Sequence, residues 1–114
     1  MLITVAELPE FQRTANGLLS AAEQSDLVTY RAAFPKAGDL IQGTGGIRKL
    51  RWARGGRGKS SGARVIYYFH SERMPLYLLT VFAKNERANM TQKERNNLGK
   101  LVRILTDSTL GKMT

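Results

Sequence analysis

Residues 64–83 read RVIYYFHSERMPLYLLTVFA, two apolar runs that lie on either side of the turn residues Met74 and Pro75. Both runs are rich in β-branched and aromatic residues, a composition that favours strands over helices. We therefore predict two adjacent central strands, over Arg64 to His70 and over Leu76 to Ala83, and expect both to be buried in a sheet.

The preceding segment, Ile47 to Ala53, alternates in polarity. Leu50 and Trp52 fall on one face of a strand, and Lys49 and Arg51 fall on the other. We predict a third strand here, with Trp52 in the core and the two cations on the opposite face. Shorter strands are expected over residues 2–6 and 39–42, the latter followed by the glycine-rich turn Gly43-Thr44-Gly45-Gly46.

Apolar residues recur at helical spacing in three segments, two of which open with the form of a capping box, Ser20-Ala-Ala-Glu23 and Thr91-Gln-Lys-Glu94. The apolar positions are Leu8, Phe11, Ala15 and Leu18, then Leu27, Tyr30 and Phe34, and finally Leu98, Leu101, Val102 and Leu105. We predict a single α+β domain over residues 1–114. It should contain an N-terminal helical hairpin, an antiparallel sheet of four or five strands and a C-terminal helix, with the helices on one face of the sheet.

The composition excludes several classes of site. The 114 residues include no cysteine and one histidine, which removes disulfides, thiolate zinc sites, cysteine nucleophiles and multi-histidine metal sites. Apolar runs such as Val65 to Phe69 are far shorter than the roughly 20 residues that a membrane span needs. We expect a cytoplasmic protein that needs no cofactor or metal and has no membrane contact.

Most of the net charge of +9 comes from one part of the chain. No acidic residue lies between Asp39 and Glu72, and outside this window 11 basic residues stand against all 9 acidic ones. A solvated surface usually mixes both signs, so the window predicts a surface that tracks phosphates. Its basic residues are Arg48, Lys49, Arg51, Arg54, Arg57, Lys59 and Arg64.

Such a surface suits RNA cleavage. RNA carries its own nucleophile, the 2′-hydroxyl, so cleavage needs in-line positioning and donors for the charge on the phosphate. Clustered Lys and Arg supply both, although a plain basic nucleic-acid-binding module is also compatible with this composition.

His70 is more typical of a polar residue beside a turn than of a catalytic group. One of Tyr67 and Tyr68 must face away from the core side of the sheet.

Three segments resemble the HigB branch of the RelE/ParE toxin superfamily: residues 38–51 (GDLIQGTGGIRKLR), 62–69 (GARVIYYF) and 78–86 (LLTVFAKNE). The resemblance implies an antiparallel sheet with two helices on one side and one near the end. It also implies a toxin of a type II toxin–antitoxin pair, which enters the ribosomal A site and cuts translated mRNA. The expected partners are a cognate antitoxin, mRNA and the ribosome, with DNA contacted only through the antitoxin.

The resemblance also implies catalytic positions. The basic strand residues of the family match Lys49 and Arg51, which would serve as base and substrate clamp. Arg64 matches the arginine that would contact the scissile phosphate, and Lys84 the residue that would stabilise developing charge or protonate the leaving oxygen. We expect the RNA- and ribosome-binding surface to include Arg48, Arg54, Arg57, Lys59 and Tyr68.

One feature of the family is missing. Several members use a tyrosine or histidine near the carboxy terminus as the acid–base group, whereas residues 85–90 read NERANM and hold neither. Glu86 is a possible substitute, so the assignment of the general acid and base stays open. The ParE-like branch, which shares the fold but inhibits gyrase without cutting RNA, is the alternative function.

Overall fold

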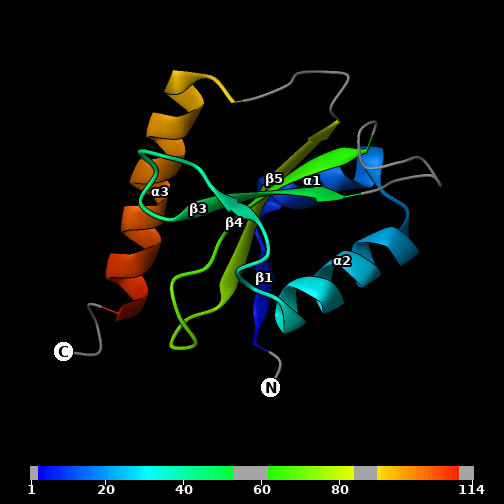
Figure 1. Ribbon diagram of the computed structural model, residues 1–114, viewed down its shortest axis with the longest axis horizontal. Coiled ribbons are helices and arrows are strands. Elements are labelled where there is room, and N and C mark those ends of the chain that lie inside the picture. Colours follow the sequence, from blue (N-terminus) through cyan, green and yellow to red (C-terminus); the bar gives the residue numbers. More distant parts are fainter. Residues whose placement is uncertain (1–2, 53–61, 84–89, 111–114) are drawn as a thin grey trace.

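The computed structural model describes residues 3–52, 62–83 and 90–110 (Figure 1). These residues form five strands and three helices. In chain order they are β1 (Val5–Glu7), α1 (Pro9–Leu18), α2 (Ala21–Ala33), β2 (Asp39–Leu40), β3 (Ile47–Trp52), β4 (Ala63–Tyr68), β5 (Leu76–Ala83) and α3 (Gln92–Leu110). The predicted α+β fold is confirmed.

The strands form one sheet in the order β1-β5-β4-β3-β2. The two central strands predicted from residues 64–83 are β4 and β5, and nearly every residue in them is buried. The pairs β2–β3, β3–β4 and β4–β5 are antiparallel as expected, but β1 pairs with β5 in parallel. Consecutive strands joined by a short turn must be antiparallel, whereas α1 and α2 separate β1 from the rest of the sheet and remove that constraint.

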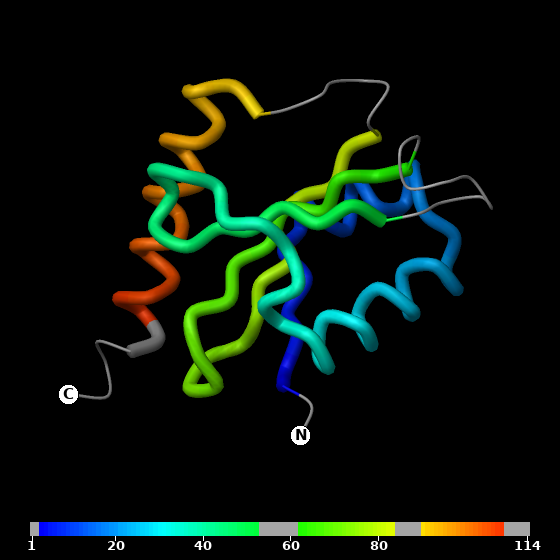
Figure 2. Tube along the Cα trace, in the orientation of Figure 1, coloured from blue at the N-terminus to red at the C-terminus, as the bar shows by residue number. Residues whose placement is uncertain are grey.

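Helices cover both faces of the sheet, so the prediction that they share one face is wrong. The α1–α2 side is packed by Phe11, Ala15 and Leu27, whereas Met90 and Val102 pack on the other side with α3. In Figure 2 the sheet separates the trace of α3 from that of α2. Strands that are buried on both faces need cover on both, and β4 and β5 are such strands.

The two predicted capping boxes are confirmed. Ser20 Oγ accepts a hydrogen bond from the backbone N–H of Glu23, and the Glu23 carboxylate accepts one from the N–H of Ser20. Thr91 and Glu94 make the same reciprocal pair at the start of α3. Each box satisfies backbone donors that the first helical turn leaves without partners.

A bulge in β5 fixes which side chains share a face with the cations of β3. Tyr67 pairs with Leu78 and Ile66 pairs with Thr80, so Leu79 is the extra residue. Beyond the bulge, Phe82 lies opposite Arg64. The shift therefore puts Phe82, near the end of β5, on the same face of the sheet as Arg64 of β4.

Candidate functional site

Two arginines lie directly opposite each other on neighbouring strands. Arg51 of β3 pairs with Arg64 of β4, and residues opposite each other in an antiparallel pair project from the same face. Arg51 is exposed, whereas Arg64 is only 5% exposed. Like charges directly opposite each other destabilise a sheet. Such a local loss of stability is typical of a functional site.

The pKa of Arg64 reflects this arrangement. Burial lowers the pKa of its guanidinium, and the positive charge of Arg51 lowers it further. Arginine nevertheless stays protonated near neutral pH, because its ordinary pKa is so high. An anion that approaches both guanidinium groups would offset the burial of one charge and the repulsion between the two.

Lys49 extends the arginine pair along β3. It pairs with Ile66 and is half-buried on the same face as Arg51, as the sequence predicts. We call Lys49, Arg51 and Arg64 the cationic face. Leu50 and Trp52 pack on the other side of the sheet, against the α1–α2 core. Because the three cations are on paired strands, their backbone positions are fixed before any ligand binds.

Asp39 is a neighbour of the cationic face that the sequence interpretation missed. It pairs with Lys49 in the β2–β3 register, so the two side chains project from the same face. Asp39 is exposed, and its register position puts a negative charge opposite Lys49 on this face. The signal was present in the sequence, since Asp39 is the acidic residue at which the acid-free window begins.

Two residues expected on the RNA surface are not brought together with the cationic face. Arg48 pairs with Tyr67 and lies on the opposite face, where its Nη1 donates hydrogen bonds to the backbone oxygens of Gly38 at 2.8 Å and Lys36 at 3.2 Å. Tyr68 is buried under α3, and its hydroxyl is 3.1 Å from the hydroxyl of Thr106. Tyr67 and Tyr68 therefore face opposite sides of the sheet, and both are buried.

Several predicted site residues lie outside the described part of the chain. They are Arg54, Arg57, Lys59 and Lys84, together with Glu86. Ala83, the last residue of β5, pairs with Ala63, the residue before Arg64. The described part of β5 therefore ends next to the start of β4, where Arg64 lies.

His70 lies away from the cationic face. It follows β4 at the end opposite Arg64, and at about 3.3 Å per residue the six intervening steps correspond to roughly 20 Å. Its ring is exposed and its Nδ1 is 3.1 Å from the hydroxyl of Ser71. His70 is thus a polar residue beside a turn, as its sequence context indicates.

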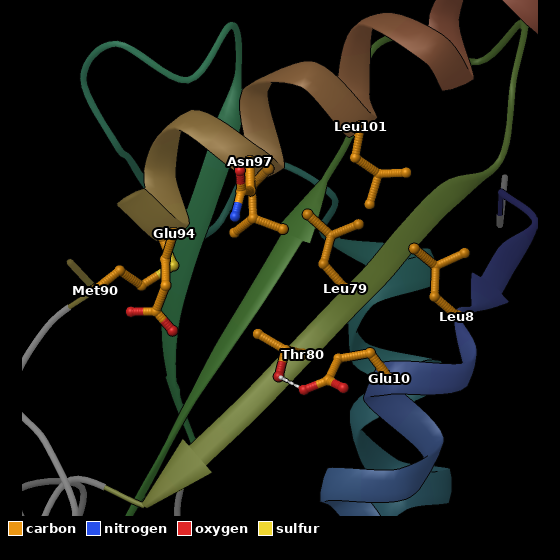
Figure 3. Close-up of a pocket in the computed structure, with 9 residues that line it drawn as sticks. Leu8, Glu10, Leu79, Thr80, Met90, Glu94, Asn97 and Leu101 are labelled. Atoms are coloured by element: carbon orange, nitrogen blue, oxygen red, sulfur yellow. Dashed lines mark hydrogen bonds between the residues drawn. The ribbon is translucent and has the colours of Figure 1, made fainter. Parts of the chain in front are cut away.

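A pocket between α1, β5 and α3 has a different character (Figure 3). Leu8, Leu79 and Leu101 are among its apolar lining residues, and the carboxylates of Glu10 and Glu94 lie among its polar ones. Two carboxylates repel phosphate, so this pocket is a poor site for RNA. Within the described residues, no group of three or more His, Asp or Glu side chains is placed to hold a metal ion.

The cationic face suits the binding and stabilisation of a phosphodiester. Guanidinium groups match phosphate oxygens with paired donors, and two of them fixed side by side can follow the growth of negative charge in a transition state. Lys49 adds a compact positive charge on the same face. Of the residues that the sequence singled out, the structure places Lys49, Arg51 and Arg64 on one face and puts Arg48 and Tyr68 elsewhere, while the other four lie outside the described chain.

Comparisons with known proteins agree with the fold. A model of the RelE toxin of the RelE/RelB toxin–antitoxin system matches residues 10–114. The structure is also similar to that of a double arginine-to-alanine mutant of the E. coli toxin RelE in the free state, with a TM-score of 0.55 and 15% sequence identity. That likeness covers 77% of this chain and 90% of the E. coli chain. Across residues 3–52, 62–83 and 90–110, no helix is both long and apolar enough to cross a membrane.

Proposed function

The chain belongs to the RelE toxin family of type II toxin–antitoxin systems, and from this we propose that it is a HigB-like, ribosome-dependent endoribonuclease. Its substrate is mRNA in the A site of translating ribosomes in the cytoplasm, and cleavage stops translation and growth. The observation that carries the proposal is the direct pairing of Arg51 with Arg64 on one face of the sheet.

The reaction uses the nucleophile of the RNA itself. The 2′-hydroxyl oxygen attacks the adjacent phosphorus, and the bond from that phosphorus to the 5′-oxygen of the next nucleotide breaks. One fragment then ends in a 2′,3′-cyclic phosphate and the other in a 5′-hydroxyl. Arg64 contacts the scissile phosphate and Arg51 clamps it, so that both stabilise the charge that grows on its oxygens.

Two proton transfers complete the step. Of the two strand residues, Lys49 is the better base, since an ammonium group loses its proton more readily than a guanidinium group. It takes the proton of the 2′-hydroxyl, and Asp39 lies opposite it in the β2–β3 register. We assign protonation of the leaving 5′-oxygen to Lys84, which follows β5 in the sequence.

Membership of the family implies an antitoxin partner. We propose that the antitoxin presents an acidic segment, because the chain carries a net charge of +9. Such a segment would neutralise the cationic face or a neighbouring basic surface. Any contact with operator DNA would then be made by the antitoxin.

Primer-extension mapping of a reporter mRNA tests the proposal. After brief expression of the wild-type chain, cuts should appear at in-frame positions within the translated region. Arg51→Ala and Arg64→Ala should abolish these cuts. Arg51 is exposed, so its variant should fold normally even if loss of the buried Arg64 side chain destabilises the sheet.

The matched control is Arg73→Ala, which removes an exposed arginine from the turn between β4 and β5 and should leave cleavage intact. Cleavage that persists in Arg51→Ala would remove Arg51 from the mechanism. An intact reporter in arrested cells that show DNA damage signalling would replace the ribonuclease with a gyrase inhibitor. Binding to duplex DNA without growth arrest would leave only the nucleic-acid-binding module.

A further inference from the structure

Three aromatic side chains meet on the side of the sheet opposite the cationic face, and they reach the surface. The ring centroid of Tyr30 lies 5.0 Å from that of Phe34 and 5.4 Å from that of Trp52. Phe34 is 56% exposed and Tyr30 is 36% exposed, while Trp52 is partly buried. We call Tyr30, Phe34 and Trp52 the aromatic patch.

A buried cation lies against the patch. The guanidinium carbon of Arg31 is 4.3 Å from the centroid of the Tyr30 ring, and the whole side chain is buried. Its Nη1 donates a hydrogen bond to the hydroxyl of Tyr67 at 3.1 Å, but its Nε and Nη2 have no hydrogen-bond partner within the described residues. The patch therefore has a positive charge behind its rings, which the local structure only partly satisfies.

Further cations border the patch. Lys36 is exposed two residues after Phe34. Arg48 lies on the same face of β3 as Trp52, held by the backbone oxygens of Lys36 and Gly38. An exposed acidic residue, Asp26, precedes Tyr30 by one helical turn, on the side away from Lys36. Aromatic rings with cations beside them match an unpaired nucleotide, whose base stacks while its phosphates pair with the cations.

The patch also lies at the same end of β3 as the arginine pair. β2 pairs only with Arg48 and Lys49 among the described residues, so β3 extends beyond β2 from Leu50 to Trp52. Arg51 and Trp52 are consecutive, and their side chains project from the two faces of this extension. A single RNA strand that crosses the edge of β3 beyond β2 can reach both faces.

We propose that the aromatic patch is a second RNA-binding site, which stacks an unpaired base of the same RNA that the cationic face binds by its phosphates. The inference rests on the proposed function, because it takes RNA to be the substrate. The aromatic patch binds the bases of the RNA, and the cationic face binds its phosphates.

Fluorescence of Trp52 tests the proposal, because the chain has a single tryptophan. The full-length chain, released from its antitoxin, is titrated with a single-stranded RNA oligonucleotide and with an oligonucleotide of the same length whose central positions are abasic. The oligonucleotide with bases should quench Trp52, and the abasic one should not. Equal responses to the two would overturn the proposal.

Three variants separate stacking from other effects. Phe34→Leu keeps an apolar side chain but loses the ring, and it should weaken binding about tenfold because one base loses its stacking partner. Phe34→Tyr should bind like the wild-type chain. Ile104→Ala removes an apolar side chain from α3 that is slightly more open to solvent than Phe34, at 61% exposed, and should leave RNA binding unchanged.

The outcomes distinguish this inference from the proposed function. Unchanged RNA binding by Phe34→Leu would overturn the stacking site, and loss of antitoxin binding in its place would assign the patch to a protein partner. Quenching by the RNA with bases but no mRNA cleavage by the wild-type chain would retain the patch and reject the ribonuclease. Cleavage of mRNA by the wild-type chain without quenching of Trp52 would retain the ribonuclease and reject the aromatic patch as an RNA-binding site.

Discussion

The pairing of Arg51 with Arg64 sets two positive charges against each other on one face of the sheet. The pKa of Arg64 is lowered by burial and then by Arg51, so the folded chain disfavours the protonated form that it carries at neutral pH. When folding lowers the pKa of a basic group, the free energy of unfolding is reduced at every pH below the folded-state pKa. That stability returns only as the pH rises above the folded-state pKa. For an arginine this pKa is strongly alkaline, so the free energy of unfolding stays reduced throughout the physiological pH range.

Arg51→Ala should therefore increase the free energy of unfolding while it abolishes cleavage. The expected gain is about 0.2–1 kcal/mol, the size of an interaction between like charges directly opposite in a sheet. Urea denaturation at neutral pH and low salt measures it, and the gain should shrink as salt rises. Arg73→Ala should change the stability little, and a less stable Arg51→Ala would show that Arg51 has a structural role.

A second residue-scale prediction concerns Tyr67. Its buried hydroxyl accepts hydrogen bonds from the backbone N–H of Gly38 at 2.9 Å and from Arg31 at 3.1 Å. Tyr67→Phe leaves both donors without this acceptor and should lower the free energy of unfolding by about 1–3 kcal/mol. Tyr77→Phe, at a half-buried tyrosine on β5, is the control for equilibrium denaturation. Equal effects of the two variants would mean that the Tyr67 hydroxyl contributes nothing specific.

At the same scale, the sequence predicted some site residues better than others. Alternation along β3 correctly separated Lys49 and Arg51 from Leu50 and Trp52, because side-chain direction in a strand is local. The same alternation puts Arg48 with Leu50, so its place on the opposite face could have been predicted as well. The pairing of Arg51 with Arg64 could not be predicted from the sequence, because it depends on the register between β3 and β4.

Helix α1 carries a prediction at the scale of elements. Gly17 lies in the last turn of α1 with an ordinary backbone, and an added Cβ would meet no atom within 4 Å. Gly17→Ala should raise the free energy of unfolding by about 0.5–1 kcal/mol, since alanine loses less backbone entropy on folding.

Gly38→Ala is the counterpart in the segment before β2. Its Cβ would lie 2.9 Å from the backbone oxygen of Lys49 and from the Tyr67 ring, so it should destabilise the chain. The two variants are compared by thermal unfolding. A Gly38→Ala protein as stable as Gly17→Ala would show that the contact between this segment and Lys49 is loose.

Elements were predictable where their signals are local. The capping boxes at Ser20 and Thr91 each lie within four residues and are confirmed. Two other features depend on contacts between distant parts of the chain: α3 packs across the sheet from α1, and β1 pairs in parallel with β5. The near-complete burial of β4 explains why helices are needed on both faces, but only the structure shows which helix covers which face.

At the scale of the whole molecule, two explanations of RNA binding compete. A net charge of +9 attracts any polyanion, whereas a fixed cationic face makes particular phosphate contacts. Arg51→Ala and Arg73→Ala lower the net charge equally and differ only in the position from which the charge is removed. Both arginines are exposed, so neither change should unfold the chain.

Salt titration of binding to single-stranded RNA separates the two explanations. Removing one ion pair between an arginine and a phosphate should reduce the slope of log association constant against log salt concentration by about 0.7. If Arg51 makes such an ion pair, Arg51→Ala lowers the slope by that amount and Arg73→Ala leaves it unchanged, because Arg73 lies at the other end of the sheet. Equal reductions in the two variants would mean that net charge alone attracts RNA, and the cationic face would then have no role in binding.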